Sequence, residues 1–196
     1  MISILFIRSL LLTLLVAAPV FGSEFTADSS IAANGQTAES KLFYAGDRWR
    51  LEERRPKGEY RVTIFREDRK SLFVLWPDKQ RYIIQPLPEK EFKILARRKP
   101  GEEVERTELG HEDISGYATI KYRVKYKVRQ ANAERIIASI EWFSKKLDFV
   151  IQSETEDGLS STKIMNIREG KLDNKLFEIP ADYQPLSKKD VFKKSE

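Results

Sequence analysis

Hydrophobic and polar residues alternate with a period of two along much of the chain, and one stretch shows this pattern at full length. From Ala118 to Val128 every second residue is apolar, and the residues between them are Thr119 and four cations. Because successive side chains of a strand point to opposite faces of a sheet, the pattern predicts a strand with one apolar and one charged face. Strands of this kind are typical of antiparallel sheets with one covered face.

Similar alternation recurs in short segments separated by turn signals such as Asn34-Gly35 and Gly46-Asp47. Pro88–Lys99 has helical spacing instead, and Glu102–Gly110 is a charged segment that we expect to be exposed. Nine to eleven strands with hairpin-sized turns indicate a mainly β chain, in the form of a strongly curved antiparallel sheet, a half-barrel. One or two short helices would serve as its lid.

The first residues have the layout of a secretory signal peptide. Arg8 precedes an apolar run, Leu10–Ala18, which is followed by Pro19 and small residues. This run is about half as long as the ~20 residues that a membrane-spanning helix needs. We therefore expect a signal peptide over 1–22, a β domain over 23–186 and a flexible basic tail over 187–196, in an exported, soluble protein.

Composition excludes several kinds of chemistry. The 196 residues include no cysteine and one histidine, His111, which leaves no disulfide, thiolate metal site or cysteine nucleophile. No phosphate-binding loop or dinucleotide fingerprint is present. The 35 cations and 30 acids leave a net charge of +5, unlike the concentrated basic footprint of a nucleic-acid binder. We expect no enzyme activity, no cofactor, no metal and no nucleic-acid partner.

The apolar and aromatic residues would give an open sheet more apolar surface than a single helix can cover. The sheet therefore either packs its own interior or leaves a concave apolar groove, and such grooves bind hydrophobic ligands. Both alternatives stay open at this point. The candidate groove residues are Trp49, Leu51, Phe65, Phe73, Leu75, Tyr82, Phe92 and Trp142.

The row of cations on the strand described first has two interpretations. It is either the solvated outer face of a half-buried strand or a surface that rests on anionic lipid head groups, at about 1 kcal/mol for each cation near the membrane. The candidate residues for an anionic surface are Lys121, Arg123, Lys125, Lys127 and Arg129.

Five segments together carry a family resemblance that covers nearly the whole predicted mature chain. The chain resembles the periplasmic outer-membrane lipoprotein carriers, the LolA/LolB-like half-barrels, and is most similar to their exported periplasmic relatives. The segments are "EFTADSS" at Glu24–Ser30, "KLFYAGDRWRLE" at Lys41–Glu52, "LWPDKQRYI" at Leu75–Ile83, "GHEDISGYATIKYRV" at Gly110–Val124 and "LFEIPADYQP" at Leu176–Pro185.

The resemblance implies a periplasmic, non-enzymatic binding protein that holds an acyl chain, a lipid or a lipidated protein in a concave apolar groove. Each methylene removed from water is worth about 0.8 kcal/mol, so acyl chains need such shielding in the periplasm. Classical carriers place a helix before the first strand, and the sequence predicts no such helix here. The lipoprotein receptor of the same fold is anchored through a cysteine, which this chain lacks. The alternative is an envelope protein-interaction or stress-sensing module with a protein partner and a closed, packed groove.

Overall fold

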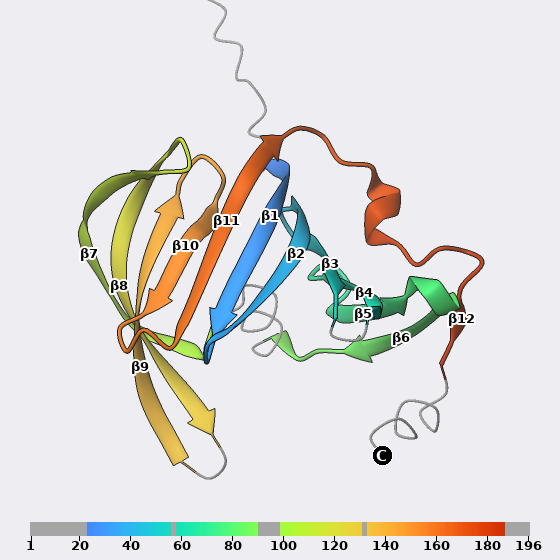
Figure 1. Ribbon diagram of the computed structural model, residues 1–196, viewed down its shortest axis with the longest axis horizontal. Helices are drawn as coiled ribbons and strands as arrows, with labels where there is room; N and C mark the ends of the chain where they lie inside the picture. Colours follow the sequence, from blue (N-terminus) through green and yellow to red (C-terminus); the bar gives the residue numbers. More distant parts are fainter. Residues whose placement is uncertain (1–22, 56–57, 90–98, 131–132, 187–196) are drawn as a thin grey trace, which may run out of the picture.

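One sheet of twelve strands makes up most of the described molecule, and its two edges do not meet in a barrel. The computed structural model describes residues 23–55, 58–89, 99–130 and 133–186. The predicted signal peptide, most of the predicted helix and the basic tail lie outside these ranges. The predicted curved, mainly antiparallel sheet is confirmed, and Figure 1 shows how it curls.

The strands follow one another in the sheet in the order β12-β6-β5-β4-β3-β2-β1-β11-β10-β9-β8-β7. All neighbours are antiparallel except β12, which pairs with β6 in parallel. The strands are β1 (Glu24–Ala33), β2 (Gln36–Ala45), β3 (Arg48–Arg54), β4 (Tyr60–Arg66), β5 (Ser71–Trp76), β6 (Arg81–Pro86), β7 (Glu102–Ile114), β8 (Tyr117–Gln130), β9 (Ala133–Ser144), β10 (Phe149–Thr155), β11 (Ser160–Glu169) and β12 (Gln184–Pro185). Two 3-10 turns are η2 (Pro77–Lys79) and η3 (Asn174–Phe177).

Two-residue turns join the first three strands as the sequence predicts. Asn34 and Gly35 both have positive φ, 51° and 75°, which is the backbone geometry that matches the twist of a hairpin. The structure has one strand more than the upper end of the predicted range of nine to eleven, and the origin of this extra strand is clear. The charged segment Glu102–Gly110 is exposed, as expected, but it forms most of the edge strand β7.

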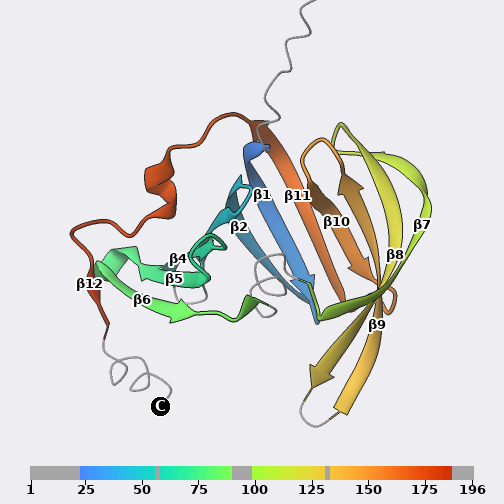
Figure 2. The same cartoon turned by 180° about the vertical axis from the view of Figure 1, so that it is seen from behind.

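The predicted two-faced strand is β8. Ile120, Val124 and Tyr126 are buried on one face, while the cations of the opposite face are at least partly exposed. Figures 1 and 2 show that the sheet curls so that β3 and β7–β10 stand on either side of β1, β2 and β11. The apolar row of β8 lies on the inner side of this curve, called the concave face below.

The outer face of β3–β6 is covered by the segment Leu172–Tyr183, called the strap below. Its Phe177 is fully buried against Val62, Ile64, Phe73 and Leu75. In Figure 1 the strap is the red segment that carries η3 and runs outside the sheet toward β12. Because the strap covers the outer face, the concave face is the candidate location for a ligand site.

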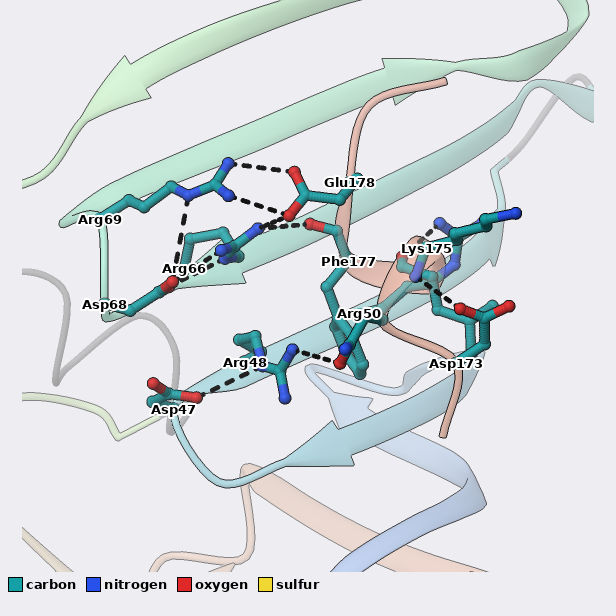
Figure 3. A network of polar contacts seen from close by, with 12 residues as sticks. Asp47, Arg48, Arg50, Arg66, Asp68, Arg69, Asp173, Lys175, Phe177 and Glu178 are labelled. Atoms are coloured by element: carbon teal, nitrogen blue, oxygen red, sulfur yellow. Dashed lines mark hydrogen bonds and ion pairs between the residues drawn. The ribbon is translucent and has the colours of Figure 1, made fainter. Parts of the chain in front are cut away.

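Arginines fasten the strap to the sheet, as Figure 3 shows. Arg66, only 4% exposed, donates through its guanidinium to the Phe177 carbonyl oxygen at 3.0 Å and to Glu178 Oε1 at 2.6 Å. Arg69 donates to both oxygens of the same carboxylate, at 3.0 and 2.9 Å. Burial by itself would raise the pKa of Glu178, but the hydrogen bonds from the two arginines outweigh it and hold the pKa below its usual range.

Candidate functional site: a cavity on the concave face

A cavity of about 300 Å³ opens on the concave face, between β3 on one side and β7–β10 on the other. This volume lies at the low end of the roughly 300–1,000 Å³ that is usual for ligand pockets. Residues from β1, β2 and β11 complete its lining. The cavity therefore spans the middle of the sheet and draws on strands from both halves of the chain.

One wall of the cavity is apolar. It is formed by Leu42, Trp49, Leu51, Phe149 and Ile164, and all five side chains belong to one buried cluster. Cross-strand pairing explains the cluster, because Leu42 faces Leu51 across the β2–β3 ladder and residues paired in this way share a face.

Aromatic rings close the apolar wall near the start of β1. Phe25, Tyr44, Trp49 and Phe149 contact one another with ring centroids 4.9–5.4 Å apart. The chain thus fills one part of its concave face with its own side chains, and the cavity lies beside this filled part.

The floor of the cavity is a row of polar residues across four neighbouring strands, called the polar rung below. Thr162 pairs with Ser153, Ser153 pairs with Glu141, and Glu141 pairs with Tyr122. All four residues line the cavity. Because the pairs are directly opposite, their side chains stand side by side on the same face.

Glu141 is the buried charge of the polar rung, with 5% of its surface exposed. Its carboxylate accepts hydrogen bonds from the Tyr126 hydroxyl and from Arg106 Nη2, the latter at 3.1 Å. Burial, followed by the negative charge of Glu141, raises the pKa of Tyr126. Tyr126 therefore keeps its proton and remains a donor to the carboxylate.

Arg106 links this floor to a second carboxylate on β7. Its Nε and Nη2 donate to the two oxygens of Glu103 at 2.8 and 2.9 Å, and Lys99 Nζ donates to Glu103 at 2.8 Å. The hydrogen bond from Arg106, which outweighs the opposing effect of burial and is aided by Lys99, lowers the pKa of Glu103 to about 2. The Arg106 guanidinium also lies 4.8 Å from the centre of the Tyr122 ring.

The structure places the candidate groove residues in several locations. Trp49 and Leu51 line the cavity, and Phe65 belongs to the same apolar cluster without lining it. Phe73, Leu75 and Tyr82 lie on the outer face with the strap. Phe92 is outside the described residues.

Trp142 faces away from the cavity. It pairs with Lys121 on the cation face of β8 and β9, where its Nε1 donates to Glu112 Oε2 at 2.8 Å and Lys121 Nζ lies 4.8 Å from the ring centre. Its neighbour Glu141 takes the inward position instead. This is the reverse of what hydrophobicity alone suggests, and it places a carboxylate where a tryptophan was expected.

Sequence reasoning missed the two charged residues at the core of the site, Arg106 and Glu141. A partial signal for Glu141 exists in the sequence, because alternation puts it on the same face of the strand as Ser139 and Phe143. No comparable signal exists for Arg106, since the extra residues of two β-bulges break the alternation of β7 between Glu103 and Glu105 and between Glu108 and Gly110.

Each candidate residue for an anionic surface lies in an ion pair. Lys121 pairs with Glu112, Arg123 with Glu156, Lys125 with Glu105, and both Lys127 and Arg129 with Glu134, at 2.6–3.5 Å. Five cations thus share four carboxylates, and the row carries a small net charge.

Among the described residues, no group of three or more His, Cys, Asp or Glu is placed to hold a metal ion. No helix in the same ranges is both long and apolar enough to span a membrane.

No protein-family model and no curated protein matches the chain. Among solved structures, PNGF-II is 13% identical with a TM-score of 0.50, over 83% of this chain and 30% of that one. The Pseudomonas aeruginosa MucA/MucB complex is 11% identical with a TM-score of 0.46, over 85% of this chain and 59% of the matched chain. LprF from Mycobacterium bovis is 12% identical with a TM-score of 0.42, over 84% and 91%.

These similarities concern the fold. The chain spans less than two thirds of the matched chains of PNGF-II and the MucA/MucB complex.

Proposed function

We propose that this chain is an exported, non-enzymatic binding protein of the periplasm that holds one acyl chain in the concave cavity. The observation that carries the proposal is the cavity itself, which keeps an apolar wall beside a polar floor on the face that the strap leaves uncovered. An amphiphile likewise joins an apolar chain, which suits the wall, to a polar head group, which suits the floor. The predicted signal peptide over 1–22 and β domain over 23–186 fit this role.

The volume of the cavity favours a ligand with a single acyl chain. At about 300 Å³ it is at the small end of the ligand range, so a fatty acyl chain matches it better than a multiply acylated lipid does. Each methylene that enters contributes about 0.8 kcal/mol. For a lipidated protein, one acyl chain would be the part that the cavity takes up.

The alternative function, an envelope protein-interaction or stress-sensing module, requires a concave face that is packed shut. The aromatic cluster around Phe149 fills part of this face, but the cavity beside it favours ligand binding. The two functions are separated by whether the purified protein takes up an acyl chain.

The test is uptake of a fluorescent fatty acid, combined with native mass spectrometry of protein purified gently from the envelope. Thr162→Phe fills the cavity from its floor, whereas Lys163→Phe adds the same ring on the outer face of the same strand. We expect wild type and Lys163→Phe to bind the probe, and Thr162→Phe to lose most of this binding. A clean apo mass and no uptake by the wild type would overturn the proposal.

A further inference from the structure

We infer that the polar rung selects a single-chain amphiphile with an uncharged, hydroxyl-bearing head group, of the monoacylglycerol type. The inference rests on the proposed function and names the class of ligand for the same cavity. It is carried by the charges and by the hydrogen-bonding groups on the cavity floor.

The charges around the floor disfavour an anionic head group. Both cations, Lys99 and Arg106, already bind carboxylates, and the low pKa of Glu103 keeps that carboxylate ionised at neutral pH. The cavity lining holds these two cations against two carboxylates, Glu141 and Asp148, and Glu103, which is not part of the lining, binds both cations. The whole group of two cations and three carboxylates has a net charge of −1, so a carboxylate or phosphate head would meet repulsion and would compete for cations that are taken.

The hydrogen-bonding groups of the floor match hydroxyls. A carboxylate offers about four acceptor positions, and Glu141 uses two of them, for Tyr126 and Arg106. Within the described ranges, the hydroxyls of Ser153 and Thr162 have no hydrogen-bond partner. Each can both donate and accept, as can a hydroxyl of the ligand, whereas a carboxylate head group can only accept.

The spacing of these groups suits a short head group with more than one hydroxyl. Directly opposed side chains on an antiparallel ladder lie roughly 5 Å apart. Thr162, Ser153 and Glu141 occupy three successive strands, so the floor presents three polar groups over roughly 10 Å. Leu42, Leu51 and Ile164 adjoin it and would hold the start of the chain.

The test compares three ligands of equal chain length, a monoacylglycerol, a fatty acid and a fatty alcohol, as competitors of an uncharged fluorescent acyl probe at pH 8. We expect the monoacylglycerol to compete most strongly. We expect Ser153→Ala to weaken its competition by roughly 2- to 10-fold, equivalent to one hydrogen bond, and to weaken that of the fatty alcohol, which has a single hydroxyl, by less. Ser161→Ala, next to Thr162 on β11 but on the opposite face of the sheet, where it pairs with Glu154, is the matched control and should change neither.

The outcomes separate the inference from the proposed function. Equal competition by the three ligands, or stronger competition by the fatty acid or by the fatty alcohol, would overturn the inference and leave acyl-chain binding intact. Equal losses in Ser153→Ala and Ser161→Ala would also overturn it. Failure of the wild type to bind the probe at all would overturn the proposed function with it.

Discussion

Arg106 Nη2 lies 3.1 Å from Glu141 Oε2, although the two residues come from strands that do not pair. The intervening strand β8 contributes to the same contact, because its Tyr126 donates to the other carboxylate oxygen. The edge strand β7 is thereby tied to the cavity floor by side chains as well as by its ladder to β8. We regard this contact as the support that holds the polar end of the cavity in place.

Loss of this contact should cost more stability than loss of a similar contact on the surface. Arg106→Gln leaves the buried carboxylate of Glu141 with one donor fewer, and we expect a loss of about 1–3 kcal/mol in the free energy of unfolding. The matched control is Arg123→Gln, whose guanidinium binds Glu156 through Nε and Nη2, as Arg106 binds Glu103, but whose side chain is 42% exposed, and which should cost far less. Urea denaturation measures both, and equal losses would contradict this role of Arg106.

Stability should fall in acid through Glu103. Its pKa is about 2 in the folded chain against an ordinary value of 4.5, so its contribution is complete above about pH 4.5 and is lost as the pH falls from there toward 2. Glu103→Gln should therefore flatten the decline of the unfolding free energy over this range. Glu105→Gln, which removes an exposed partner of Lys125, serves as the control. An unchanged slope in Glu103→Gln would show that the carboxylate is not paired in solution.

The two arginines on Glu178 should differ in their effect on the strap. Arg66→Gln removes a buried guanidinium that also holds the Phe177 carbonyl, and we expect a loss of about 1–3 kcal/mol. Arg69→Gln removes a half-exposed partner of the same carboxylate and should cost about 1 kcal/mol or less. Thermal and urea unfolding measure the difference, and similar losses in the two variants would contradict a buried fastening point.

The cation row should contribute little to membrane binding, because its five cations share four carboxylates. We expect the double variant Lys125→Glu/Lys127→Glu to cosediment with vesicles of anionic phospholipid to the same extent as the wild type. A marked loss of sedimentation in the variant would restore the interpretation of this row as a membrane-facing surface. Vesicles of neutral phospholipid provide the baseline.

Sequence alone predicted the parts of the fold in which local pattern and tertiary environment agree. The unbroken alternation of β8 gave both the strand and its faces, because one of these faces is buried along most of its length. The edge strand β7 escaped recognition because β-bulges shift its register and its side chains are exposed. An exposed edge carries no apolar signature to detect.

The candidate site was harder to predict than the fold because it depends on which face of each strand turns inward. β5 is apolar on both faces, so the sequence did not distinguish Phe73 and Leu75, which lie under the strap, from Leu72 and Val74. A shift of one residue exchanges the two faces, and the same ambiguity exchanged Trp142 with Glu141. Long-range contacts, such as those of the strap, decide these choices.

Quenching of Trp49 fluorescence by a monoacylglycerol with a brominated chain tests the central claim most directly, because Trp49 is the tryptophan that lines the cavity. We predict saturable quenching in the wild type and its loss in Trp49→Phe. Two results would contradict the account, because each would place the brominated acyl chain outside the cavity. One is quenching that persists unchanged in Trp49→Phe. The other is an absence of quenching in the wild type at concentrations that displace the acyl probe.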